Sequence, residues 1–349
     1  MKNLKISTSI ALSLLLPIVG LVLFSGSMVL DKRHTATDMQ GLHDLAQLAP
    51  VISNLAHELQ MERGASAVFI GSKGKKLKEE LPQQFTITDA KKDAFIATLH
   101  RYDASAFNVA APVAAAPETP DGEAQAAAQP EQGEVEGAPL IPLPEGVANE
   151  LVEKMNVAID ALNAIEKTRG KTLKRRSTVL NMAKYYTTTI TKLMAIVEEM
   201  TVLSSNAKVT NAIIAYTSFL QAKERAGGER DLGAAGFAAH KFKFFVHKNF
   251  IEIIAQQEAF LQTFAVSATD AQNAFLKETL VGDAVAEVDR LRVLAISSNE
   301  PGASIRDISD EQWSNAITAK IQRLKLVEDR LAEDLITLAG DIQHSAQNA

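Results

Sequence analysis

Three arginines occupy positions where the surrounding sequence predicts the buried faces of helices. Apolar residues recur every three or four positions ahead of Arg63, and the arginine falls on the same stripe. A second stripe, which starts at Val209, reaches Arg230, and a third stripe carries Arg292. A guanidinium keeps its charge at any physiological pH, so each buried arginine needs an anionic partner.

Two kinds of partner fit these arginines. Carboxylates of the protein itself are available nearby at Glu62, Glu224 and Glu229, and spacing alone favours internal pairing. The alternative is a small planar oxyanion, which guanidinium groups bind in a bidentate way. Small residues at 64–66 and 227–228 leave room for such a ligand beside Arg63 and Arg230.

The elements that must position these arginines are long amphipathic helices. Apolar residues make up 46% of the 349 residues and aromatic residues only 5%, a balance that favours helices over strands. Helical spacing predicts helices over about 206–248 and 268–297, and another through Tyr185 and Ile190. A last helix is expected to start at a capping box formed by Ser309 and the glutamine three residues later. The predicted fold class is therefore all-α.

The N-terminus predicts a membrane anchor. An uncharged run from Ile10 to Leu30 is long enough, at 1.5 Å per residue, to cross a bilayer core of about 30 Å. Residues 1–34 are therefore expected to form a cytoplasmic stub and a transmembrane signal anchor, with a cleaved signal peptide as the alternative. Residues 35–349 would then lie on the exported, periplasmic side of the inner membrane.

One internal segment and the absence of cysteine limit the chemistry. Residues 108–146 contain seven acidic residues and seven of the eleven prolines but no Lys or Arg, which predicts a disordered acidic Pro/Ala-rich loop. Without cysteine the chain has no disulfide, thiol nucleophile or thiolate metal site. No catalytic motif is present, so the sequence predicts no enzyme activity, no metal and no cofactor.

The formal net charge of −6 gives no general reason to expect nucleic acid as a partner. One stretch nevertheless mixes aromatic and basic residues: Lys241, Phe242, Lys243, Phe244, Phe245, Lys248 and Phe250. We interpret its phenylalanines as core residues and its lysines as solvated, so no nucleic-acid partner is predicted.

The chain resembles the nitrate- and nitrite-sensing (NIT) domain of bacterial receptors. The matching motifs are Glu58–Ser66, Tyr185-Tyr186, Ala222–Arg230, and Trp313 with Lys320-Ile321. In this order they cover about residues 35–345 apart from the acidic loop. Met61 departs from the pattern, since relatives often have a basic residue beside the first arginine.

The resemblance implies two stacked four-helix bundles that share long helices. It also implies a nitrate or nitrite site lined by Arg63, Arg230 and Arg292. Such domains usually lie between two membrane spans of chemotaxis or kinase receptors. The chain is therefore expected to be a homodimeric periplasmic receptor domain that passes a helix shift toward the membrane or a downstream signalling module. The alternatives are a sensor of another small anion, or a structural helical bundle that docks a membrane partner.

Overall fold

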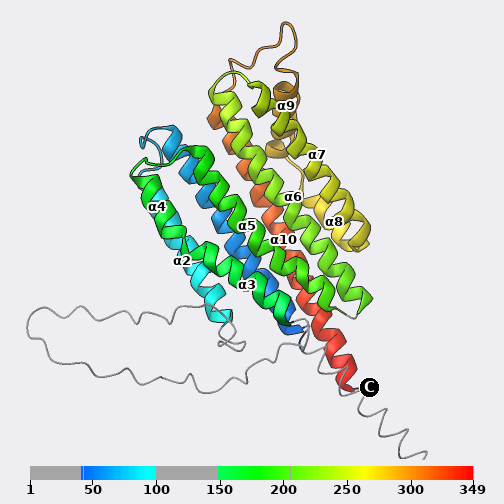
Figure 1. Ribbon diagram of the computed structural model, residues 1–349. Helices are drawn as coiled ribbons and strands as arrows, with labels where there is room; N and C mark the ends of the chain where they lie inside the picture. The colour runs from blue at the N-terminus through cyan, green and yellow to red at the C-terminus, as the bar shows by residue number, and fades with distance from the viewer. Residues whose placement is uncertain (1–40, 42, 100–147, 205, 349) are drawn as a thin grey trace, which may run out of the picture. The chain divides into compact units, whose positions relative to one another are not determined.

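The computed structural model describes residues 41, 43–99, 148–204 and 206–348, and every regular element in these ranges is a helix (Figure 1). The prediction of an all-α fold is confirmed. A first helix covers 43–71, and the others are α2 (Glu80–Leu99), α3 (Ala148–Asn163), α4 (Ile165–Leu173), α5 (Val179–Leu203), α6 (Ala207–Ala238), α7 (Phe244–Ser267), α8 (Asp270–Thr279), α9 (Asp283–Ser297) and α10 (Asp310–Asn348).

Two sequence predictions concern parts of the chain outside the described residues. These are the transmembrane run at 10–30 and the acidic loop at 108–146. Within the described ranges, none of the helices combines the length and apolar character needed to cross a bilayer.

The chain divides into two compact units, and the division falls inside two continuous helices. Unit 2 is Asn54–Ile196, and unit 1 contains the remaining residues on either side of it. Helix 43–71 therefore contributes to both units, and so does α5.

Unit 2 contains residues 54–71 of the first helix, together with α2, α3, α4 and most of α5. Only Ala164 separates α3 from α4 (Figure 1). The first helix ends where Lys73 adopts a φ of 56° and Gly74 a φ of 80°. The Gly74 amide there donates to the Phe69 carbonyl at 2.8 Å, which is the bond that closes a left-handed helix cap.

Unit 1 contains α6 to α10, and α6 packs against α7 and α10. The helix predicted over 206–248 ends at Ala238, because His240 takes a φ of 50° and the chain turns into α7. The helix predicted over 268–297 is also two helices, separated at Gly282, whose φ is 102°. Val281 lies at this break and is exposed.

Glycines on α6 allow large aromatic side chains to approach its backbone closely. A Cβ atom at Gly233 would lie 2.3 Å from the indole of Trp313 on α10, and one at Gly236 would lie 2.3 Å from the ring of Phe242. The Trp313 indole nitrogen also donates to the backbone carbonyl of Arg230 at 3.0 Å. Gly233 and Gly236 therefore admit core side chains.

The two units follow the same internal plan, which is clearest in their first helices. Glu229-Arg230 of α6 lies 167 positions after Glu62-Arg63, and all four residues are buried. The same offset relates the helix ends, since Lys241 donates to the Gly236 carbonyl at 3.1 Å as Gly74 does to Phe69.

The remaining helices correspond as well. The helices α5 and α10 begin with equivalent caps, since Thr178 Oγ1 accepts from the Asn181 amide at 3.2 Å and Ser309 Oγ accepts from the Gln312 amide at 3.0 Å. The buried residues of α2 and α7 share one spacing, with Leu81, Phe85, Thr88 and Phe95 in one unit and Phe250, Ile254, Gln257 and Phe264 in the other. Equivalent positions in the two units can therefore be compared.

Candidate functional site

Arg63 is one of the largest fully buried side chains of the described chain, with 1% of its surface exposed. It lies in unit 2 on helix 43–71, directly after Glu62, which is fully buried. Successive helical residues are rotated by about 100° relative to each other, so these two side chains cover different parts of one broad buried face. Arg63 Nη1 donates to the hydroxyl of Thr187 on α5 at 2.8 Å.

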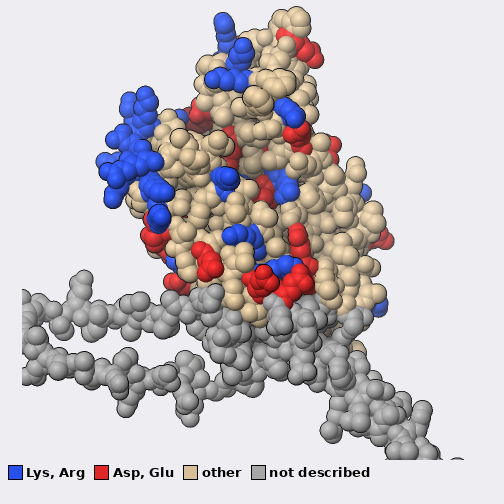
Figure 2. Space-filling model, viewed as in Figure 1, with Lys and Arg blue, Asp and Glu red and all other residues tan. Residues whose placement is uncertain are grey.

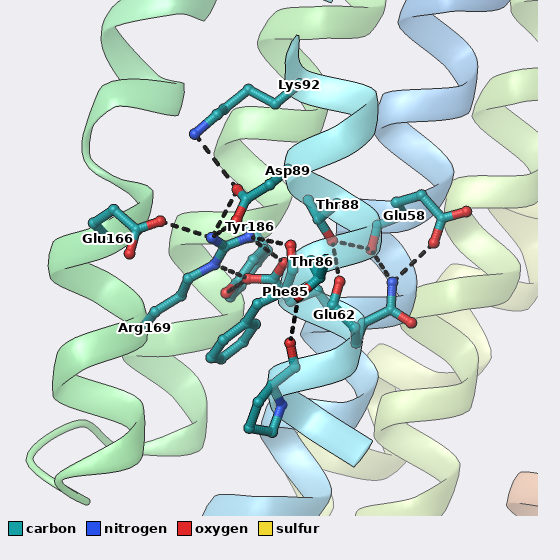
Figure 3. Close-up of polar contacts among 12 residues, drawn as sticks. Glu58, Glu62, Phe85, Thr86, Thr88, Asp89, Lys92, Glu166, Arg169 and Tyr186 are labelled. Atoms are coloured by element: carbon teal, nitrogen blue, oxygen red, sulfur yellow. Dashed lines mark hydrogen bonds and ion pairs between the residues drawn. The ribbon is translucent and has the colours of Figure 1, made fainter. Parts of the chain in front are cut away.

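The carboxylate of Glu62 is bound by Arg169 of α4 (Figure 3). Arg169 Nε and Nη2 donate to the two oxygens of Glu62 at 2.9 and 2.8 Å, which is a bidentate ion pair. The Tyr186 hydroxyl donates to the same carboxylate at 2.5 Å. Arg169 Nη1 reaches Asp89 of α2 at 2.8 Å and Glu166 of its own helix at 2.7 Å. Helix 43–71, α2, α4 and α5 thus each contribute to one polar layer around Arg169.

The electrostatics of this layer favour the charged pair. Burial alone would lower the pKa of the Arg169 guanidinium, but the hydrogen bonds and negative charges of Glu62 and Asp89 raise it above its usual value. Burial, and then the charge of Glu62, raise the pKa of Tyr186 well above 10. Tyr186 therefore acts as a hydrogen-bond donor to Glu62 at all physiological pH values.

Unit 1 repeats this pair with Glu229 and Arg292. Arg292 Nε and Nη2, on α9, each donate to one oxygen of Glu229 at 2.6 Å. Gln257 of α7 donates to Glu229 at 3.1 Å and accepts from Arg292 at 2.9 Å. In unit 2 Glu166 lies three residues before Arg169, and in unit 1 Asp289 lies three residues before Arg292, at 3.5 Å from it. Burial would lower the pKa of Arg292, but its pairing with Glu229 raises it.

Arg230 follows Glu229 on α6 and is buried. Its Nε lies 3.7 Å from the carboxylate of Asp231, and its backbone carbonyl accepts the Trp313 hydrogen bond. Arg63 belongs to unit 2, whereas Arg230 and Arg292 belong to unit 1. Arg292 is held by a buried glutamate of its own unit, Glu229.

Another cation on the predicted seam, Lys223, is paired internally. It is fully buried on α6 and donates to Glu328 of α10, which is itself fully buried. Burial lowers the pKa of the Lys223 ammonium, and the charge of Glu328 opposes that effect. Internal pairing, which spacing alone favoured, thus applies to this residue.

Sequence reasoning missed the role of Arg169, which is the arginine that binds Glu62. The repeated spacing of Glu166 with Arg169 and of Asp289 with Arg292 was a signal that could have revealed this equivalence.

Basic side chains gather over one end of unit 2, where helix 43–71 ends and α5 begins (Figure 2). The turn at 72–79 and the turn at 173–178 meet there, since Arg175 Nη1 donates to the Lys73 carbonyl at 3.1 Å. The exposed cations are Lys73, Lys75, Lys76, Lys78, Lys171, Lys174, Arg175 and Arg176. These cations therefore lie on a solvated end of the unit.

The aromatic and basic stretch of unit 1 was interpreted only partly correctly. Phe242 and Phe250 are buried as predicted, but Phe244 and Phe245 are 73% and 75% exposed. The reason is the turn before α7, which changes the phase of the helical pattern. The pattern therefore gives no ground for excluding nucleic acid.

These residues define an all-α domain whose buried arginines lie beside paired glutamates. Residues 54–336 match the family described as nitrate and nitrite sensing. This chain belongs to that family, as the resemblance predicted.

Two relatives accompany the family match. The chain is 25% identical over 308 residues to the "Nitrate regulatory protein" of Klebsiella oxytoca, an alignment covering 86% of this chain and 65% of that protein. The chain thus spans just under two thirds of that relative's length. A solved structure of the NasR transcription antiterminator shares the fold, with a TM-score of 0.71, 22% identity, and coverage of 92% of this chain and 75% of the other.

These relatives correct the predicted setting of the domain. The prediction of a periplasmic receptor of the chemotaxis type, anchored in the inner membrane, is wrong, because the relatives are a nitrate regulatory protein and a transcription antiterminator. The predicted docking to a membrane partner is wrong for the same reason. The exclusion of nucleic acid is also wrong, since it cannot be maintained for a relative of a transcription antiterminator. The homodimer stays a prediction.

Proposed function

We propose that this chain is a regulatory domain that binds nitrate or nitrite, and that Arg63 and Arg230 bind the anion. Membership of the nitrate- and nitrite-sensing family supports the ligand class. The name of the Klebsiella oxytoca relative, a nitrate regulatory protein, supports a regulatory role.

The observation that carries the assignment of residues is the equivalence of Arg63 and Arg230. Each follows a fully buried glutamate on the first helix of its unit, and in each unit that glutamate is bound bidentately by a different arginine. Among the described residues of unit 2, the buried Arg63 thus lies next to an ion pair between Glu62 and Arg169.

Arg292 has a different place in the proposal. Its Nε donates to Glu229 and its Nη2 to Gln257, and its Nη1 lies 3.5 Å from Asp289. Its role as a direct ligand stays a prediction from the resemblance. We assign it a positioning role, in which it holds Glu229 and so fixes the turn of α6 that carries Arg230.

The finer architecture belongs to the same proposal. We infer that the units are two four-helix bundles that share helix 43–71 and α5. The division of the chain inside these two helices supports this inference. The absence of catalysis, of a metal and of a cofactor also remains a prediction.

Titration calorimetry of the full chain with nitrate, nitrite and chloride tests the proposed function. Arg63→Ala and Arg230→Ala should each weaken nitrate binding by about ten- to a hundredfold, the equivalent of a charge-assisted hydrogen bond worth about 1.5–3 kcal/mol. Arg306→Ala is the matched control, because that arginine is exposed. The binding stoichiometry shows whether one or two anions bind.

Two results would contradict the proposal. A wild-type chain that gives no heat with nitrate or nitrite at millimolar concentration does not have the proposed function. A folded Arg63→Ala variant with wild-type affinity removes Arg63 from the site, and the same holds for Arg230. Circular dichroism of each variant confirms that helicity is retained.

A further inference from the structure

Lys320 is a buried lysine in the middle of the long helix α10. Only 6% of its surface is exposed. It lies on the same buried stripe as Trp313, which contacts α6 at Gly233 and Arg230, and Glu328, which contacts α6 at Lys223. Seven residues, or about two helical turns, separate it from Trp313. Lys320 therefore lies on α10 between the two contacts that Trp313 and Glu328 make with α6.

The charged groups that act on Lys320 are Arg292, Glu229, Asp289 and Glu258. Glu229 is the fully buried carboxylate of this set, and Arg292 already holds both of its oxygens. The side chain of Asp289 is 61% exposed and Glu258 is exposed, so water screens their charges. Among the described residues, none forms a hydrogen bond or an ion pair with the Lys320 ammonium.

This arrangement is unfavourable in isolation. A buried ammonium that is not paired costs several kcal/mol, and here a guanidinium lies near it as well. Burial, and then the charge of Arg292, lower the pKa of Lys320. The same layer thus concentrates positive charge that its buried carboxylate does not balance.

The equivalent helix of unit 2 shows that packing does not require a lysine here. The helices α5 and α10 begin at equivalent caps, so Lys320 corresponds to Thr189. Thr189 is buried and donates to the Tyr185 carbonyl at 2.9 Å, a local bond within its own helix. The cation is therefore a feature of unit 1 alone.

We propose that Lys320 is a further anion-binding residue, whose ammonium contacts from α10 the nitrate or nitrite bound by Arg230. This inference rests on the proposed function. An anion held by both residues would bridge α6 and α10, and its charge would offset the unbalanced cations of this layer. Binding would then favour the arrangement of α10 in which Lys320 reaches the anion.

The test compares Lys320→Met, Lys320→Gln and Lys320→Arg with the wild type, by nitrate calorimetry and by thermal unfolding without ligand. Lys277→Met on α8 is the control, because Lys277 is an exposed lysine of the same unit. Lys320→Met should lower nitrate affinity by about tenfold or more. Its unfolding midpoint should equal or exceed that of the wild type, since the desolvation cost of the ammonium is removed. Lys320→Gln should follow Lys320→Met in affinity, and Lys320→Arg should retain most binding.

Weaker binding together with unchanged or higher stability is a combination that a purely structural lysine would not give. Wild-type affinity in Lys320→Met or Lys320→Gln overturns the inference and leaves the proposed function standing. Absence of nitrate and nitrite binding by the wild type overturns both. A Lys320→Met chain that fails to fold, with a folded Lys320→Gln chain of normal affinity, identifies a structural role and also overturns the inference.

Discussion

The pair of Glu62 and Arg169 allows a quantitative test of the buried layer in unit 2. We consider Glu62→Gln, which removes the negative charge with little change in shape. Glu62 is fully buried and accepts from Arg169 and Tyr186. Removing one partner of a buried ion pair typically costs about 3–5 kcal/mol. Arg169 keeps Asp89 and Glu166, so we expect the lower end, about 3 kcal/mol.

The matched comparison is Asp89→Asn, which removes another carboxylate from the same guanidinium. The Asp89 side chain is 37% exposed, and its interaction with Arg169 is therefore partly screened. Exposed ion pairs contribute about 0–1 kcal/mol, so Asp89→Asn should cost about 1 kcal/mol or less. Each variant removes one negative charge beside Arg169, so the difference between their losses of stability measures the effect of burying the carboxylate.

Chemical denaturation of the full chain, followed by circular dichroism, measures both values. The melting temperature of Glu62→Gln should fall by about 6–12 °C, at roughly 2–4 °C for each kcal/mol in a protein of this size. The double variant Glu62→Leu with Arg169→Met should be more stable than either single variant, because it leaves no unpaired buried charge. A loss for Glu62→Gln no greater than that for Asp89→Asn would refute the reasoning.

Two further predictions concern the core. Gly233→Ala should destabilise the protein by about 1–3 kcal/mol in denaturation experiments, because its Cβ would meet the Trp313 indole at 2.3 Å. Gly71→Ala, which would meet nothing within 4 Å, is the control and should be neutral or stabilising. Burial raises the pKa values of Tyr186 and Tyr216, so the stability that depends on them is complete below pH 10 and is lost as the pH rises above 10. In a spectroscopic alkaline titration both tyrosines should ionise only when the protein unfolds, and ionisation in the native state would contradict this.

The sequence was sufficient to predict which faces of the long helices are buried. Arg63, Arg230 and Lys223 were placed on those faces by spacing alone, and all three are buried. Spacing is a local property of a helix, and burial of one face depends on it directly. The same information could not show which carboxylate binds which cation. Glu62 and Arg169 are 107 positions apart, and their meeting depends on tertiary packing.

One error of prediction lies where the chain turns without a strong signal. The stretch around 239–243 contains no proline or glycine, so the helical pattern seemed to continue into α7. His240 instead adopts a left-handed conformation that histidine takes more readily than most residues. After this turn the periodicity restarts with a new phase, and Phe244 and Phe245 face the solvent.

The repeated plan of the two units separates the residues that hold the helices from the residues that we propose bind the anion. In each unit a bidentate arginine joins the glutamate of the first helix to another helix, α4 in unit 2 and α9 in unit 1. That contact does not require a ligand, because both partners belong to the protein. Arg63 and Arg230 directly follow Glu62 and Glu229 on the same helical turns. In the ion pairs described above, those glutamates are bound by Arg169 and Arg292. A ligand that binds there meets guanidinium groups whose backbone is already fixed, which lowers the entropic cost of ordering the site. Glu62 and Glu229 therefore do not compete with the proposed anion for Arg63 and Arg230, because Arg169 and Arg292 already bind them. This pairing makes a preorganised anion site possible.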